Sequence, residues 1–189
     1  GGRQADIVLD TEQLVLALYH QLDVEGLLTR DRFRDLNRKT LDLILKEARS
    51  FGIKEVLPTR AAGEAEGLRF EDGQVFVPEC YRRVHELILD MELASPTEDP
   101  EVGGQGLPHL FARAASEFLV GANWSLVTYP FTGHGTGKMI ELYGSEAQKQ
   151  QWVTPVATGE KIGAFSLTEP MSGSDAGARC SPERTRTRA

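Results

Sequence analysis

Apolar residues recur through most of the chain at the three- and four-residue intervals of helices that bury one face. Residues 11–22 have a wide apolar face, and Asp10 or Thr11 precedes it as a candidate N-cap. Residues 38–56 carry a narrower stripe, which Pro58 is expected to end. The members of that stripe are Leu41, Ile44, Leu45, Ala48 and Phe51. Both segments therefore predict helices that pack against other elements.

Two further helices are expected to begin at prolines, because proline has no amide hydrogen to lose in the first turn of a helix. One starts at Pro78 and ends at Ser95 and Pro96, and the other starts at Pro108. Their apolar stripes are, in turn, Tyr81, Val84, Ile88 and Met91, and Phe111, Ala114, Ala115 and Phe118. His85 lies among charged residues on the other face of its helix, so we interpret it as solvated.

Two segments rich in glycine separate these helices. Residues 59–77 contain Glu-Asp-Gly at positions 71–73, and they are predicted to form a surface loop with room for a short hairpin. Residues 96–108 are also predicted to be a loop. Its glycines are Gly103, Gly104 and Gly106, which we interpret as a turn that lets two helices pack closely.

The stretch 124–143 is apolar with small residues, and it includes Gly-His-Gly-Thr-Gly at 133–137. No Lys-Ser/Thr pair follows this run and no clear strand precedes it. We therefore interpret it as a connection between buried helices rather than as a phosphate cradle. No nucleophile or orienting partner for His134 is identifiable in the sequence, so this histidine is not expected to act as a catalytic base.

The last part of the pattern changes from helix to strand. Ser145 and Gln148 have the spacing of a capping box and predict a short helix. Residues 162–167 are mostly apolar and predict one short strand, which the Thr-Glu-Pro at 168–170 stops. Small residues follow at 171–177, with backbone amides free to face a ligand. The pattern alone favours a solvated turn over a ligand loop by roughly two to one.

About six helices followed by one strand indicate a mainly α fold, a helical bundle domain followed by the first strand of a β domain. The expected organisation has four parts. Residues 1–30 form an extension with one helix, 31–161 the helical domain, 162–178 the start of the β domain, and 179–189 an arginine-rich tail that is expected to be disordered.

Composition narrows the function classes. The 189 residues carry a net charge of −7, which argues against a nucleic-acid partner. No apolar run approaches the ~20 residues that span a bilayer, and no signal sequence opens the chain, so a cytoplasmic location is expected. The two cysteines and four histidines have no metal-ligand spacing, so no metal site is expected.

Three motifs in order resemble the acyl-CoA dehydrogenase family. Residues 165–175 (Phe-Ser-Leu-Thr-Glu-Pro-Met-Ser-Gly-Ser-Asp) resemble its flavin-contacting signature. Residues 142–152 and 157–164 resemble the helix and turn that lead into it, and 100–108 resembles its glycine-rich entry to a core helix. The family usually has an aromatic residue where this chain has Val102. Together the motifs are far more specific than a single glycine loop.

The resemblance implies FAD-dependent α,β-dehydrogenation of an acyl-CoA thioester. It implies that the flavin is contacted by Phe165, Leu167, Thr168, Gly173 and Ser174, with the Thr168 hydroxyl bonding the isoalloxazine edge. Ser174 is also expected to approach the acyl-CoA. In the family the base carboxylate, much of the adenosine site and the main oligomer interface lie in parts that find no match in this sequence. No residue here is therefore assigned as the base.

The resemblance also implies partners: an acyl-CoA substrate, an electron-transfer acceptor protein and, for the full-length family, a homo-oligomer. The N-terminal extension is similar to that of the 3-methylmercaptopropionyl-CoA dehydrogenase group. The match stops after Ala178, so we expect a fragment that is inactive alone. Two alternatives remain open, a non-catalytic helical interaction module and a relative of the acyl-CoA oxidases that passes electrons to oxygen.

Overall fold

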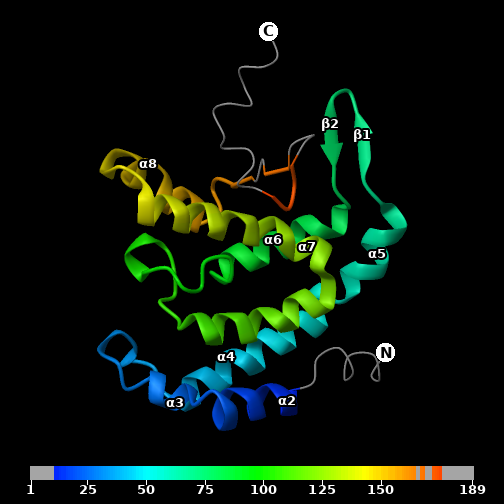
Figure 1. Cartoon of the computed structure of the whole chain (residues 1–189). Helices are drawn as coiled ribbons and strands as arrows, with labels where there is room; N and C mark the ends of the chain where they lie inside the picture. The colour runs from blue at the N-terminus through cyan, green and yellow to red at the C-terminus, as the bar shows by residue number, and fades with distance from the viewer. Residues whose placement is uncertain (1–10, 165–166, 169–171, 176–189) are drawn as a thin grey trace.

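The computed structural model describes residues 11–164, 167–168 and 172–175, and these form a mainly helical protein (Figure 1), which confirms the predicted fold class. Its α-helices are α2 (Thr11–Leu16), α3 (Val24–Leu27), α4 (Arg38–Phe51), α5 (Pro58–Glu66), α6 (Glu79–Asp90), α7 (His109–Tyr143) and α8 (Glu146–Ala157). Strands β1 (Arg69–Glu71) and β2 (Gln74–Phe76) form an antiparallel hairpin. Short π- or 3₁₀-helical turns cover Ala17–Gln21, Asp31–Phe33, Gly52–Val56 and Pro100–Val102.

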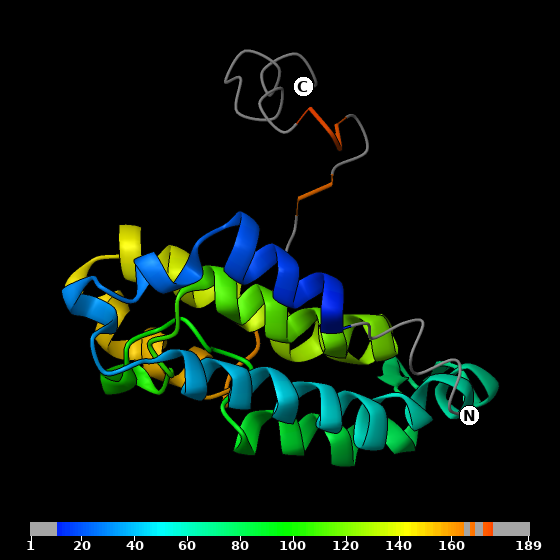
Figure 2. The ribbon, with the colours of Figure 1, turned by 90° about the horizontal axis from the view of Figure 1, so that it is seen from below.

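The hydrophobic core consists of two clusters that share α4 and α7. The first joins the N-terminal helices to both of them, and Figure 2 shows α2 and α4 lying alongside α7. Its buried members include Leu18, Val24, Leu41, Leu45, Phe111 and Phe118. The second cluster brings in α6, and its buried members include Phe51, Val56, Val84, Ile88, Leu126 and Val127. The predicted stripes of α4 and α6 therefore point into the core, except that Met91 is 41% exposed at the end of α6.

Helix α7 bends at Asn123, whose φ of −159° and ψ of 93° are not helical. The Asn123 side chain is buried, and its Nδ2 donates a hydrogen bond of 2.9 Å to Oγ1 of Thr59 in α5. The Thr59 hydroxyl in turn donates to the carbonyl of Val56 at 2.6 Å. The bend separates a first arm, 109–122, from a second arm, 124–143, which run in different directions (Figure 1).

The structure corrects three of the interpretations drawn from the sequence. Pro58 was expected to end a helix and leave a surface loop, but it begins α5, because proline also suits the first turn of a helix. The run 133–137 was interpreted as a connection, but it lies inside α7, where Gly133 and Gly137 are buried against Val156 of α8. His85 is half-buried rather than solvated, and burial lowers its pKa despite the opposing charge of Glu86.

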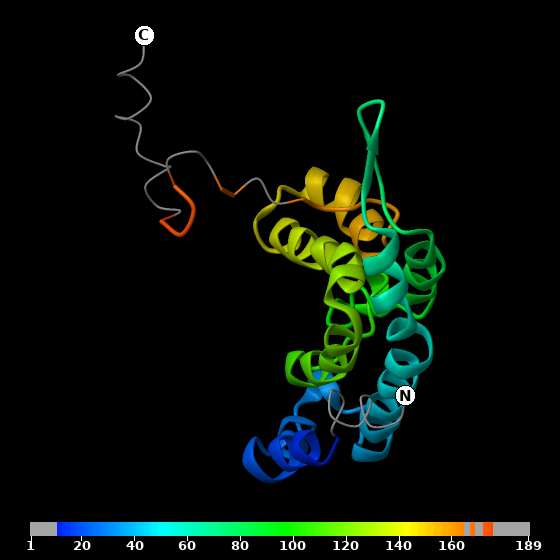
Figure 3. The ribbon, with the colours of Figure 1, turned by 90° about the vertical axis from the view of Figure 1, so that its right-hand side faces the viewer.

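The capping box and the hairpin are confirmed. Ser145 Oγ accepts from the amide of Gln148, and the Gln148 side chain accepts from the amide of Ser145 at 2.8 Å. The hairpin turns at Asp72 and Gly73, which both have positive φ. Figure 3 shows it extending away from the helices, and it leaves the side chain of Phe70 73% exposed.

The predicted strand at 162–167 is not formed by its described residues. Residues 162–164 and Leu167 have no strand pairing. A strand is stable only when its backbone groups pair with a neighbour. The hairpin is the only sheet among the described residues, so this segment has no described strand to pair with. The four-part domain organisation remains a prediction.

We predict that Asn123→Ala destabilises the protein by about 1–3 kcal/mol, because it removes the buried side-chain amide that donates to the Thr59 hydroxyl. Urea unfolding followed by circular dichroism measures the change. Ser125→Ala, an exposed substitution on the same helix, is the control and should change the free energy of unfolding by less than about 0.5 kcal/mol. Equal effects of the two substitutions would show that the bend does not depend on this hydrogen bond.

Candidate functional site

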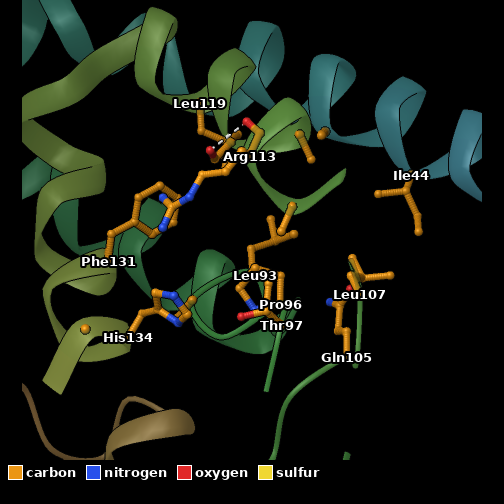
Figure 4. Close-up of a pocket in the computed structure, with 16 residues that line it drawn as sticks. Ile44, Leu93, Pro96, Thr97, Gln105, Leu107, Arg113, Leu119, Phe131 and His134 are labelled. Atoms are coloured by element: carbon orange, nitrogen blue, oxygen red, sulfur yellow. Dashed lines mark hydrogen bonds between the residues drawn. The ribbon is translucent and has the colours of Figure 1, made fainter. Parts of the chain in front are cut away.

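The bend of α7 encloses a cavity of about 190 Å³. Both arms of the helix line it, together with α4 and the segment that connects α6 to α7 (Figure 4). Its larger apolar side chains are Ile44, Leu93, Leu107, Leu119 and Phe131. The cavity is therefore a mainly apolar space inside the helical domain, of a kind that binds small ligands.

Polar residues also line this cavity, namely Thr97, Gln105, Arg113, Ser116 and His134. His134 projects from the second arm toward the segment that carries Leu93, Pro96 and Thr97 (Figure 4). Its Nδ1 lies 2.7 Å from Oε1 of Glu98, whose side chain is only 3% exposed. The distance is that of a charge-assisted contact, but the ring N–H is not aligned well enough for a regular hydrogen bond. An acidic and a basic side chain thus lie in close contact in a buried setting.

The loop before α7 places Glu98 by folding back on itself. The carbonyl of Glu98 accepts a hydrogen bond of 2.8 Å from the amide of Gly106. Gly103 has a φ of 98°, and a Cβ on Gly104 would collide with the Glu98 backbone. Only glycines permit this close approach. The interpretation of these residues as a tight turn between helices agrees with this geometry.

Charges around the pair hold Glu98 ionised. Burial raises the pKa of the Glu98 carboxyl, but contact with His134, the amide of Glu98 itself and the charge of Lys138 together lower it below its ordinary value. His109 lies in the same field. Burial lowers the pKa of His109, and the nearby His134 and Lys138 lower it further, although Glu98 opposes them.

No orienting partner for His134 was identifiable in the sequence, and the structure supplies one in Glu98. The two residues lie far apart along the chain, on a loop and on the second arm of α7. No motif links them. A helical position for the run 133–137 was the signal that could have placed His134 on an inward face of α7.

The predicted flavin-contacting residues lie on the segment beyond α8. Thr168 and Ser174 are exposed, and Leu167 is 45% exposed. A Cβ on Gly173 would lie 3.6 Å from Cγ2 of Thr168, so these two residues are neighbours. Phe165 lies outside the described residues. Among those that are described, none of this loop's residues lines the α7 cavity.

The described residues contain neither a metal cluster nor a membrane-spanning helix. No group of three or more histidine, cysteine or acidic side chains is arranged to hold a metal ion there. Within the same residues, no helix has both the length and the hydropathy that crossing a bilayer requires.

Comparison with known proteins identifies the domain that contains this cavity. A family model described as "Acyl-CoA dehydrogenase, N-terminal domain" matches residues 38–160, which include α4 to α8. The chain belongs to the acyl-CoA dehydrogenase family. This confirms the resemblance drawn from the three motifs.

Two curated acyl-CoA dehydrogenases illustrate the relationship. The 3-methylmercaptopropionyl-CoA dehydrogenase of Ruegeria pomeroyi is 34% identical over 131 residues, covering 69% of this chain and 22% of that protein. The human mitochondrial short-chain specific acyl-CoA dehydrogenase is 35% identical over 149 residues, covering 77% of this chain and 33% of that protein. This chain thus spans no more than about a third of the length of these relatives.

A solved acyl-CoA dehydrogenase has the same helical arrangement. The butyryl-CoA dehydrogenase of Megasphaera elsdenii superposes with a TM-score of 0.59 at 26% identity, covering 75% of this chain and 35% of that one. The observed fold is therefore that of the N-terminal helical domain of the family.

We predict that Glu98→Gln lowers the free energy of unfolding by about 1–3 kcal/mol at pH 7, because it leaves His134 beside a neutral amide. The folded-state pKa of Glu98 is depressed, so its stabilising contribution is present above the ordinary value of 4.5 and is lost as the pH falls through the folded value. The difference between native and variant should therefore narrow below about pH 4.5.

Urea unfolding at a series of pH values measures this difference. Glu101→Gln changes an exposed carboxylate of the same loop and serves as the control, with an expected effect of less than about 0.5 kcal/mol. A constant difference across the whole pH range would contradict the assigned charge on Glu98.

Proposed function

We propose that this chain supplies the helical part of an enzyme that dehydrogenates acyl-CoA thioesters, and that the α7 cavity holds the acyl chain. The observation that carries the proposal is the cavity, which has mainly apolar walls and is lined almost wholly by residues that match the family's helical domain. Each buried CH₂ contributes about 0.8 kcal/mol to binding. An apolar cavity of about 150 Å³ admits benzene, so a space of about 190 Å³ suits a short acyl group.

The loop beyond α8 supports a flavin site as part of this proposal. Thr168 is exposed beside Gly173, which has no side chain to shield the backbone, so the polar edge of a flat ring can reach both. When bound, a flavin supplies the acceptor for the hydride that leaves the β-carbon of the substrate. In the proposal FAD is held by Phe165, Leu167, Thr168, Gly173 and Ser174, and Ser174 also approaches the acyl-CoA.

The proposal assigns no catalytic base to this chain. Glu98 is nearly fully buried and is in contact with His134, so its carboxylate is not free to remove the α-proton of a substrate. An electron-transfer acceptor protein and further copies of the chain belong to the proposal through the family resemblance. The cytoplasmic location expected from the sequence stays a prediction.

We predict that the purified chain, incubated with FAD and desalted, retains a flavin absorbance band, and that Thr168→Val weakens this retention. Valine keeps the shape of threonine and removes the hydroxyl that the proposal assigns to the flavin edge. Absorbance spectra of the two proteins measure the bound fraction. Thr29→Val, which changes an exposed threonine of the N-terminal part, is the matched control and should retain FAD as the native chain does.

Two results would contradict this part of the proposal. One is a colourless native chain whose helical circular dichroism is intact, which favours the non-catalytic module. The other is equal retention by the native chain and Thr168→Val.

We predict that Ala112→Leu, which fills the cavity, weakens binding of pentanamide by about tenfold, because the added side chain occupies the space of the acyl group. Pentanamide represents a short acyl group without coenzyme A. Ligand-observed NMR titration measures the dissociation constant.

Ala61→Leu makes the same change on the exposed face of α5 and is the control. It should leave binding unchanged. Binding that survives Ala112→Leu undiminished would place the acyl group elsewhere.

A further inference from the structure

Buried polar atoms gather at one wall of the mainly apolar cavity. Ser95 is 1% exposed, Thr97 3% and Glu98 2%. Among the described residues, Ser95 Oγ, Thr97 Oγ1 and Oε2 of Glu98 have no hydrogen-bond partner, whereas Oε1 of Glu98 contacts Nδ1 of His134. Buried polar groups in folded proteins are normally paired. A cluster of unpaired groups beside a cavity therefore indicates that something polar binds there.

Two members of this cluster line the cavity itself, Thr97 from the loop and His134 from α7. Figure 4 draws both at the same side of the cavity. The Thr97 hydroxyl can both donate and accept a hydrogen bond. Because its oxygen is buried and unpaired among the described residues, it has hydrogen-bonding capacity for a ligand.

Glu98 determines what His134 offers. An ionised carboxylate oxygen 2.7 Å from a ring nitrogen requires a proton between them, so Nδ1 carries a hydrogen and faces Glu98. Nε2 is the ring atom left to form a hydrogen bond with a ligand.

We infer that Thr97 and His134 form a polar subsite that selects short acyl groups bearing a hydroxyl beyond the reacting α- and β-carbons. The inference rests on the proposed function, because it takes the cavity as the acyl site. The ligand hydroxyl forms one hydrogen bond with Nε2 of His134 and another with Oγ1 of Thr97. A chain that ends in a methyl group at this position leaves both groups unpaired, so the subsite discriminates against it.

Water provides the competing explanation for the unpaired atoms, since a polar cavity of this size can hold ordered water. The two explanations predict different binding affinities for a ligand that carries a hydroxyl. A hydroxyl that satisfies both Thr97 and His134 gains over an isosteric methyl group. A subsite whose water stays in place gives no such gain.

The test compares two isosteric probes, 4-hydroxybutanamide and pentanamide, which differ by a hydroxyl in place of a methyl group. Each is titrated into the complete 189-residue chain by isothermal calorimetry. The native chain should bind the hydroxylated probe tighter by about tenfold or more. Thr97→Val should abolish this preference while leaving the affinity for pentanamide unchanged, because valine removes only the hydroxyl.

Thr128→Val, an exposed threonine of the second arm, is the matched control and should keep the preference. A second readout is the ¹⁵N shift of His134 Nε2, which should move with 4-hydroxybutanamide and not with pentanamide. His134→Leu should also abolish the preference, which keeps the test decisive if one variant folds poorly.

The results separate the inference from the function on which it rests. Equal binding of both probes by the native chain, or an undiminished preference in Thr97→Val, overturns the polar subsite and leaves the acyl cavity standing. Failure of the native chain to bind either probe overturns the acyl cavity and the subsite together.

Discussion

The hydrogen bond between Asn123 and Thr59 stabilises the departure of α7 from helical geometry, and the arrangement of the domain depends on that bend. A buried side-chain amide must find partners, and Thr59 supplies one from α5. The bend directs the second arm of α7 toward the segment that precedes the helix. A straight helix would carry Phe131 and His134 away from the walls they now share with Leu93 and Leu107. The cavity is therefore a product of the bend.

The loop that closes the cavity solves an electrostatic problem. A carboxylate as buried as Glu98 is costly unless positive or hydrogen-bonding groups surround it. Gly104 lets the chain approach itself closely enough to bring Glu98 under α7, where His134 and Lys138 are available. The same contact turns Nδ1 of His134 toward the carboxylate and leaves Nε2 for other partners. Backbone flexibility at a few glycines thus sets the chemistry of a side chain on another element.

Patterns within short stretches of the sequence predicted the features that depend on residues close together in the chain. The stripe of α4 and the capping box of α8 follow from periodicity and short-range hydrogen bonds, and both are found. Proline at position 58 was ambiguous, because it ends one helix and suits the start of the next. The bend and the His134–Glu98 pair depend on partners distant in sequence, which no local pattern contains. The strand at 162–167 needed a neighbouring strand, and the flavin contacts came from family resemblance and stay predictions.

Because α4 and α7 take part in both core clusters, neither cluster can open without disturbing helices that support the other. The elements that touch one cluster only, α3 at one end and α6 at the other, can detach at a smaller free-energy cost. Slow hydrogen exchange should therefore be concentrated in α4 and α7. The domain is therefore organised around one pair of helices that both clusters share, and the α7 cavity lies beside that pair.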